Sequence, residues 1–272
     1  MSKRNSHQAK TAARERLRAE RERQAKRDKL KRQSIVAGSI VAVLAIAGGV
    51  GYLVMQGTKP THWEAAKDAP LVAPKNTTGK NHTTVTLGKD SAKKTIISFE
   101  DPRCPICATF EQTVGPTVDK DLKDGKYKLQ YVGATFLDTN LRGEGSRNAV
   151  SALGAALDVS KDAFLHYKAA MYSAKWHPEE TDDKFKDDAY LIEIANTVPE
   201  LKNNTAFQKD VKDGTFDRWA IEMSKNFDTN TYDVKGTPSF VVDGKKITGS
   251  DGENAPMTVD EWNTAVGKAL SS

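Results

Sequence analysis

Hydrophobic and polar positions become regular from residue 83 onward. Thr83–Leu87 alternates between polar and apolar side chains, which predicts a short strand. Thr95–Phe99 is a compact run rich in β-branched residues and is typical of a buried strand. A helical apolar period then continues through Phe110 and Val114, and Lys126–Phe136 returns to strand character.

The next part of the chain carries only helical patterns. Between Gly143 and Phe227 no stretch alternates like a strand. The segments with helical periodicity are Ser146–Leu157, Lys161–Ser173, Ala189–Ala195, Thr205–Asp213 and Phe216–Phe227.

Strand character comes back near the C-terminus. Ser239–Val242 is a β-branched run, Asp243-Gly244 is a hairpin turn signal, and Lys246–Thr248 is expected to pair back. Thr258–Leu270 is a closing helix, because Thr258 followed three residues later by Glu261 matches a capping box.

This order of elements predicts an α/β fold with a helical insertion. A βαβ unit and a ββα unit flank the helical block, so we expect residues 83–137 and 228–272 to form one domain and residues 138–227 an inserted helical domain. Residues 56–82 contain several Pro and Gly residues and little apolar periodicity, which favours a linker.

A long apolar run precedes this linker. Ser34–Met55 is 22 residues without a charged side chain, and at about 1.5 Å per residue it is long enough to cross the hydrocarbon core. A buried core helix and a cleaved signal peptide are the alternatives. The run exceeds the ~7–15 residues of a signal peptide's apolar region, and no small-x-small site follows its end. The pattern therefore predicts one transmembrane helix over residues 34–55.

The positive charge of the chain is concentrated before that helix. Residues 1–33 hold 13 Lys and Arg and four acidic residues, which leaves 28 basic and 32 acidic residues downstream. The positive-inside rule places this basic arm in the cytoplasm and residues from about 57 onward outside the cytoplasm. We therefore expect a single-pass protein of the plasma membrane whose catalytic domain lies in the cell envelope. The mildly acidic body argues against nucleic-acid binding.

The chain has only two cysteines, Cys104 and Cys107, and three interpretations compete for them. A zinc site needs four ligands, and neither a third cysteine nor a suitable histidine spacing is present, so no metal site is expected. A structural disulfide across two residues would restrict the unfolded chain little. A redox-active pair is favoured, because the predicted compartment permits disulfides and the pair lies at a strand-to-helix junction.

The position of Cys104 at a helix start has a chemical reason. Unpaired backbone N–H groups and the helix dipole stabilise a thiolate there, and Pro105 suits the first helical position. A lowered thiol pKa makes Cys104 both the better nucleophile and the better leaving group. Cys107, one turn further on, is placed to resolve a mixed disulfide.

A second element lies directly before the predicted hairpin. In Gly236-Thr237-Pro238-Ser239-Phe240 the proline either opens an edge strand or forms a cis peptide bond beside the cysteines. In the second case the Thr237 backbone is free to bind a substrate chain as an added strand.

The runs SFEDPRCPICATFE and GTPSFVVDGKKITG together resemble the DsbA family of bacterial thiol:disulfide interchange proteins, which have a thioredoxin-like fold. The resemblance covers about residues 83–270. It implies that Cys104 is the nucleophile, Cys107 the resolving thiol and Pro238 the cis-proline with Thr237 before it, and that Gly115-Pro116 marks a kink in the active-site helix. No cofactor is implied beyond the redox-active Cys104–Cys107 disulfide.

Two positions depart from the family pattern. Many relatives carry a buried acidic residue six positions before the first cysteine, where this chain has Ser98; we expect Glu100 and Asp101 to lie on the wrong face or at the mouth of the site. The residues between the cysteines, Pro105 and Ile106, include no histidine, so we expect a milder oxidant than the strongest relatives. Arg103, expected to be exposed, is the candidate for partial compensation.

These features predict a protein thiol–disulfide oxidoreductase that introduces or exchanges disulfides in unfolded exported proteins. The resemblance implies a membrane redox partner, either a quinone-linked oxidase or an electron donor. An extracytoplasmic disulfide reductase and a non-catalytic, envelope-anchored peptide-binding module are the alternatives.

The predicted orientation is testable in cells. A reporter enzyme that is active only outside the cytoplasm should be active when it is fused after Ser272, because the basic arm retains the N-terminus inside. Protease added to intact spheroplasts should digest residues 57–272. Protection of these residues, with cleavage of the basic arm instead, would contradict the orientation.

Overall fold

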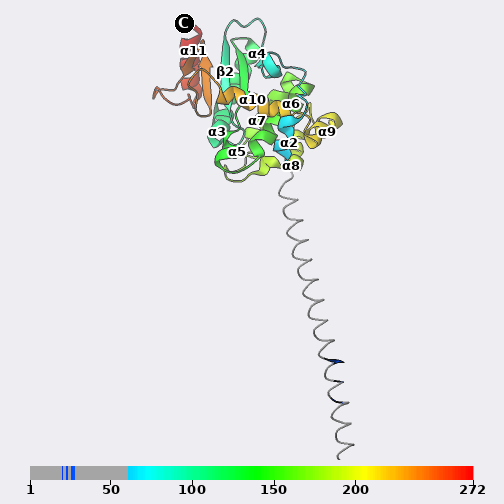
Figure 1. Ribbon diagram of the computed structural model, residues 1–272. Coiled ribbons are helices and arrows are strands. Elements are labelled where there is room, and N and C mark those ends of the chain that lie inside the picture. Colours follow the sequence, from blue (N-terminus) through cyan, green and yellow to red (C-terminus); the bar gives the residue numbers. More distant parts are fainter. Residues whose placement is uncertain (1–19, 21–22, 24–25, 28–60, 272) are drawn as a thin grey trace, which may run out of the picture. The chain divides into compact units, whose positions relative to one another are not determined.

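The computed structural model describes residues 20, 23, 26–27 and 61–271 (Figure 1). The chain divides into two units, Met1–Thr61 and His62–Ser272. Most of the basic arm and the whole predicted transmembrane helix, residues 34–55, lie outside the described residues. Within the described part of the chain, no helix is both long and apolar enough to span a membrane.

The second unit is built on a five-stranded mixed sheet with the strand order β1-β3-β2-β4-β5. Strands β2 and β3 are parallel, and the other neighbouring pairs are antiparallel. The predicted strands are confirmed, with ends that differ from the prediction by up to three residues: β1 Val85–Leu87, β2 Thr95–Glu100, β3 Lys128–Gly133, β4 Ser239–Val242 and β5 Lys245–Ile247.

The central position of β2 follows from its sequence. Ile96 pairs with Leu129 on one side and with Val242 on the other, so the β-branched run lies between two apolar strands. The hairpin turn is also as expected. Asp243 and Gly244 both have positive φ, at 48° and 77°, which is the backbone of a two-residue turn between antiparallel strands.

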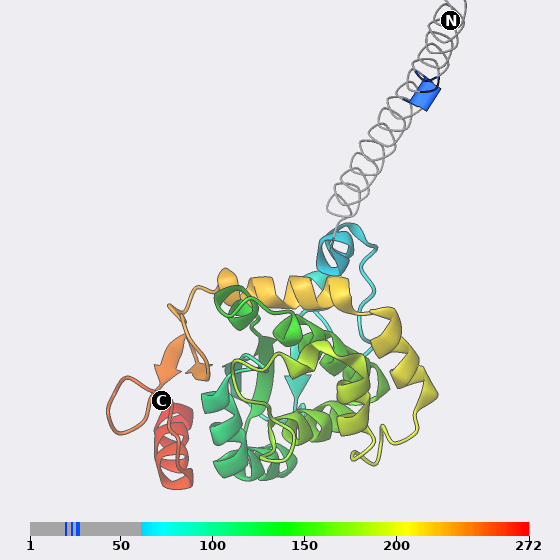
Figure 2. The ribbon, with the colours of Figure 1, turned by 90° about the horizontal axis from the view of Figure 1, so that it is seen from below.

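Helices surround this sheet and follow the predicted order. Helices α3 and α4 meet at Val114, where Gly115-Pro116 starts the second of them, so the expected kink is confirmed. The helices from α3 onward are α3 Pro105–Thr113, α4 Gly115–Asp124, α5 Phe136–Asn140, α6 Gly145–Val159, α7 Lys161–Tyr172, α8 Asp188–Ala195, α9 Thr205–Asp213, α10 Asp217–Asp228 and α11 Val259–Ser271. Figures 1 and 2 both show α11 and α9 at opposite ends of the unit.

The helical insertion shares its core with the sheet. One buried cluster contains Leu129 of β3, Trp262 of α11 and the inserted helices' Phe164 and Trp219. Helix α6 runs through this cluster, and at Gly154 a Cβ atom would lie 2.9 Å from the Trp219 ring. The inserted helices therefore pack with the sheet in one compact unit. The division of this unit into two domains at residues 138 and 227 stays a prediction.

The predicted linker is wrong for the part of it that the structure describes. Residues 62–82 pack on the fold: helix α2, His62–Asp68, buries Trp63 to 3% exposure in the main core. The Asn76 amide donates to the Leu157 carbonyl at 2.7 Å, and Thr78 forms a bridge with Thr84. A single tryptophan among Pro and Gly residues gives no periodic signal, so the sequence pattern does not reveal this contact.

The anchoring of α2 makes a stability prediction. Trp63→Ala should lower the free energy of unfolding by about 3 kcal/mol, because it empties a buried aromatic site. Urea unfolding of the full chain followed by far-UV circular dichroism measures this change. Lys67→Ala on the exposed side of the same helix is the control and should change stability by less than about 0.5 kcal/mol. Equal midpoints for both variants would show that α2 does not stabilise the unit.

Candidate active site at the two cysteines

The first cysteine caps the helix that carries the second. Strand β2 ends at Glu100, and Cys104 is the N-cap of α3 with extended backbone, φ −72° and ψ 117°. Its Sγ accepts a hydrogen bond from the Cys107 backbone N–H at 3.4 Å, and Pro105 occupies the first turn. The predicted placement of Cys104 at a helix N-terminus is confirmed.

The two thiols have opposite acidities. The pKa of Cys104 is lowered to about 6 by a hydrogen bond from the Cys107 thiol, by the Thr237 side chain and by the Cys107 and Ile106 amides, which together outweigh burial. Burial raises the pKa of Cys107 well above its ordinary value, and the Cys104 and Glu100 charges add to this effect. At neutral pH the reduced pair therefore holds a thiolate at Cys104 and a thiol at Cys107.

The Thr237–Pro238 peptide bond is cis, as one of the two interpretations required. It lies beside the nucleophile: the Cys104 thiol donates to the Thr237 carbonyl at 3.4 Å. The Thr237 hydroxyl is buried, and while Cys104 is a thiol it forms no hydrogen bond with the described residues. When Cys104 is a thiolate, the Thr237 hydroxyl can donate a hydrogen bond to its sulfur, whereas the Thr237 carbonyl oxygen can only accept one.

The residues between the cysteines face solvent. Ile106 is 52% exposed, and Pro105 is exposed as well. The contribution of Ile106 to the Cys104 thiolate comes from its backbone amide. Its apolar side chain is therefore free to contact another molecule.

The expectation for Glu100 is wrong. Its carboxylate is buried at 3% exposure, accepts from the Ser98 hydroxyl at 2.6 Å, and pairs with Lys168 of α7 at 3.0 Å. Because Glu100 raises the Cys107 pKa, it acts on the side of the resolving thiol. The helical insertion covers the end of β2, so both faces of the strand are buried there and strand alternation alone does not tell which side chains are exposed.

Arg103 and Asp101 also differ from expectation. Arg103 is 2% exposed and forms ion pairs with Asp138 and Asp183. Its positive charge is therefore buried and neutralised by these carboxylates, and it is not free to stabilise the Cys104 thiolate. Asp101 is fully buried, and burial raises its pKa to about 7. The hydrogen bonds it accepts from Ser146 and the Arg103 and Leu137 amides oppose that rise.

The sequence gives no signal for several residues that surround the cysteines. Tyr172 and Leu137 pack with both cysteines in one apolar cluster, and the Tyr172 hydroxyl is buried without a partner among the described residues. Tyr172 comes from the helical insertion and Leu137 directly precedes it, and neither lies in a recognisable motif. Only the contact between distant segments identifies them.

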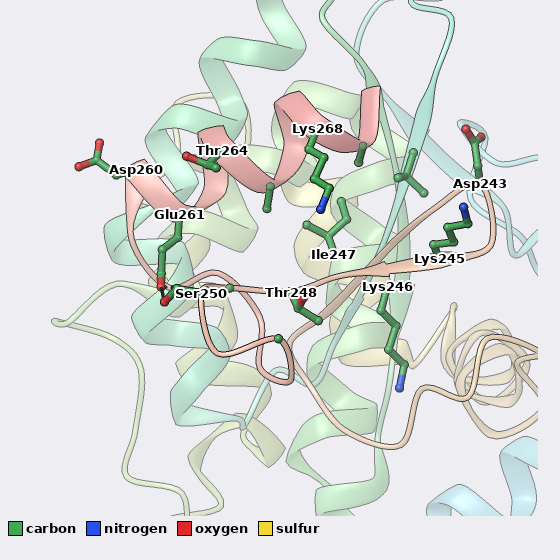
Figure 3. Close-up of a pocket in the computed structure, with 15 residues that line it drawn as sticks. Asp243, Lys245, Lys246, Ile247, Thr248, Ser250, Asp260, Glu261, Thr264 and Lys268 are labelled. Carbon is green, nitrogen blue, oxygen red and sulfur yellow. Dashed lines mark hydrogen bonds between the residues drawn. The ribbon is translucent and has the colours of Figure 1, made fainter. Parts of the chain in front are cut away.

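A surface pocket lies away from the two cysteines. It has a volume of about 860 Å³ and is lined by β5, the following loop and α11. Figure 3 shows Lys268 extending from α11 toward Ile247 in this pocket. Two of its acidic side chains are engaged locally, Asp243 with Lys94 and Glu261 with Ser250. In the part of the chain described, no group of three or more His, Cys, Asp or Glu side chains is arranged to hold a metal ion.

Comparison with known proteins decides the family. The sequence model of the family described as Thioredoxin matches residues 80–268. The chain belongs to the thioredoxin family. Among curated relatives, disulfide bond formation protein D of Bacillus subtilis is 27% identical over 59% of this chain and 68% of its own length. A probable disulfide bond formation protein D of Bacillus cereus is 24% identical over 81% of this chain and 92% of its own length.

Solved structures agree on the fold. Oxidised DsbA of Mycobacterium tuberculosis is similar with a TM-score of 0.56 and 22% identity, covering 70% of this chain and 93% of that one. Oxidised BdbD of Bacillus subtilis is similar with a TM-score of 0.54 and 22% identity, covering 74% of this chain and 99% of that one. The predicted thioredoxin-like fold with a helical insertion is thus the fold of this thioredoxin-family chain.

The acidity of Cys104 makes a prediction for alkylation. In the reduced chain iodoacetamide should modify Cys104 and not Cys107, with a rate that is half-maximal at a pH of about 6, because only the thiolate reacts. Thr237→Val should move this midpoint upward, since it removes a hydroxyl donor from the thiolate. Peptide mass mapping across a pH series measures both effects. Ser239→Ala, two residues further on, is the control; modification of Cys107, or a midpoint near the ordinary value of 9.0, would refute the assignment.

Proposed function

We propose that this protein thiol–disulfide oxidoreductase introduces or exchanges disulfides in unfolded exported proteins through Cys104 and Cys107. The observation that carries the proposal is the opposite acidity of the two thiols. The pKa of Cys104 is lowered to about 6, and burial raises the pKa of Cys107 well above its ordinary value. A cysteine pair in a purely structural or binding role has no need of this difference.

The reaction moves two electrons from a substrate dithiol to the Cys104–Cys107 disulfide. A substrate thiolate attacks Cys104 Sγ, the Cys104–Cys107 bond breaks, and Cys107 leaves and takes up a proton. A second substrate thiolate then attacks the substrate sulfur of the mixed disulfide and expels Cys104. Cys104 leaves readily because its thiolate is stabilised at the helix start. The reverse sequence reduces a substrate disulfide, with Cys107 resolving the intermediate.

The substrate chain would bind alongside Thr237 and Pro238. The Thr237 carbonyl lies 3.4 Å from Cys104 Sγ, which supports binding of an extended peptide at this backbone as an added strand. Partly buried apolar side chains next to the cysteine cluster, Phe136 and Leu141, and the exposed Ile106 would contact its side chains. An unfolded protein supplies both the free backbone and the apolar side chains.

The proposed location is the outer face of the plasma membrane. Residues 34–55 would anchor the chain with its N-terminus in the cytoplasm, as the charge distribution favours. A membrane redox partner, a quinone-linked oxidase or an electron donor, would reset the cysteine pair after each turnover. The names of the Bacillus relatives support disulfide formation as the direction.

Reduction is the second candidate, and the acidity of Cys104 favours it in part. A pKa of about 6 lies nearer the ~7 of thioredoxin, a reductant, than the ~3.5 of the strongly oxidising DsbA. The equilibrium poise of the pair against glutathione decides between the two directions.

The reduction potential is therefore the central measurement. Glutathione titration of the full chain should give a value between about −120 and −270 mV, because the Cys104 thiolate is stabilised less than in the strongest oxidants. Ile106→His should raise the potential by a few tens of millivolts (about 30 mV for each tenfold change in equilibrium constant) and lower the Cys104 pKa. Thr109→His, on the exposed side of α3 one turn further on, is the control. Equal shifts in both variants, or none, would show that the residue between the cysteines does not tune the pair.

A further inference from the structure

The short loop that joins β2 to the nucleophile is held by the helical insertion at each of its residues. Asp101 accepts from the Ser146 hydroxyl of α6 at 2.6 Å and from the Leu137 amide of α5 at 3.2 Å. The Pro102 carbonyl accepts from His177 Nε2 at 3.0 Å. The third residue of the loop, Arg103, has the largest number of these contacts.

Arg103 joins two separate parts of the insertion. Its Nη1 lies 3.1 Å from Asp138 of α5 and 3.0 Å from Asp183, and its Nη2 donates to the Glu180 carbonyl at 3.0 Å. Asp183 in turn accepts from the Gly145 amide at 3.0 Å. The guanidinium, 2% exposed, is thus enclosed by two carboxylates that neutralise its charge.

Three of the contacts to this loop, those of His177, Glu180 and Asp183, come from one segment, residues 173–187, which we call the α7–α8 connection. The connection is itself anchored: Tyr190 donates to the Trp176 carbonyl at 2.6 Å, and Asn148 donates to the Phe185 carbonyl at 3.0 Å. Phe185 is fully buried. The connection is therefore a fixed support for the loop before the nucleophile.

The close approach of these groups requires the glycines of the neighbouring turn. A Cβ atom at Gly145 would lie 2.6 Å from Asp183 Oδ1, and one at Gly143 would collide with the Arg103 guanidinium. A buried ion cluster adds little net stability, because desolvation offsets the attraction between its charges. Such a cluster is better suited to holding one geometry, and here the geometry it holds is the backbone next to Cys104.

We infer that Arg103 and His177 are positioning residues for the Cys104 nucleophile, through which the α7–α8 connection sets the reactivity of the cysteine pair. This inference rests on the proposed role of Cys104. The thiolate of Cys104 is stabilised by the Cys107 N–H, which donates to Sγ at 3.4 Å, and the strength of this hydrogen bond depends on its geometry, so a displacement of the backbone before Cys104 weakens it. Arg103 acts through position, because its charge is already balanced by Asp138 and Asp183.

His177→Phe isolates one contact of the connection. Phenylalanine retains an aromatic ring to pack on Tyr172 and Phe185, the ring neighbours of His177, and loses the donor to the Pro102 carbonyl. The full chain is equilibrated with glutathione, and the alkylation midpoint of Cys104 is measured in parallel. We expect the equilibrium constant for reduction of the Cys104–Cys107 disulfide by glutathione to fall about three- to tenfold, which is the size of effect expected from one lost hydrogen bond. The alkylation midpoint of Cys104 should move to higher pH by a matching amount. His177→Gln, which retains a donor, should recover part of the change.

Arg103→Met and Arg147→Met form a matched pair. Arg147 also binds Asp138, at 3.2 Å, but makes no contact with the loop before Cys104 in the described structure. Arg103→Met should shift both readouts in the same direction as His177→Phe, and Arg147→Met should change them less than about twofold. Far-UV circular dichroism shows whether each variant is folded, and His177→Phe decides the question if Arg103→Met is not.

The outcomes separate the two proposals. If Cys104 of the unchanged chain does not react as the thiolate, the proposed function fails. If Cys104 reacts as proposed but folded His177→Phe matches the unchanged chain, the positioning role is wrong. Equal shifts in Arg103→Met and Arg147→Met would assign the effect to the charge of the cluster and likewise overturn it.

Discussion

The capping of helix α3 by Cys104 is the constraint around which this structure is organised. A helix start leaves backbone N–H groups without partners, and here a sulfur atom accepts the one from Cys107. The same atom lies against the Thr237–Pro238 bond, which brings a segment from the far end of the chain to the site. Because the folded-state pKa of Cys104 lies below its ordinary value of 9.0, the reduced form gains stability that is complete above that value and is lost as the pH falls through about 6.

The resolving thiol is governed by burial. Cys107 lies one turn into the helix, 2% exposed, in an apolar cluster with Tyr172 and Leu137. Removing a thiolate from water is costly, so this environment keeps the proton on Cys107 while Cys104 loses its own. Glu100 adds negative charge on the same side, held in place by the buried Lys168. The two cysteines thus differ because one meets a helix end and the other an apolar interior.

The helical insertion is an integral part of the active site. It supplies Tyr172 to the cysteine cluster, Lys168 to the nearby buried Glu100, and the ion-paired carboxylates that enclose Arg103. It also shares the main core with the sheet, so its helices cannot shift far without disturbing that packing. This arrangement explains why the loop between β2 and α3 is buried, although its residues include two charged side chains.

The sequence by itself determined the features that depend on local chemistry. The Cys-Pro-Ile-Cys run starts a helix because Pro105 suits its first turn, Asp243-Gly244 turns the hairpin because both positions adopt positive φ, and Thr237-Pro238 matched a family motif. Only the tertiary structure decided which side chains are buried at the ends of these elements. Glu100, Arg103 and Trp63 were expected in exposed or irregular surroundings, and each is buried by a partner far away in the chain. Strand alternation and composition describe one element at a time, whereas the burial of a charge depends on which distant segment packs over it.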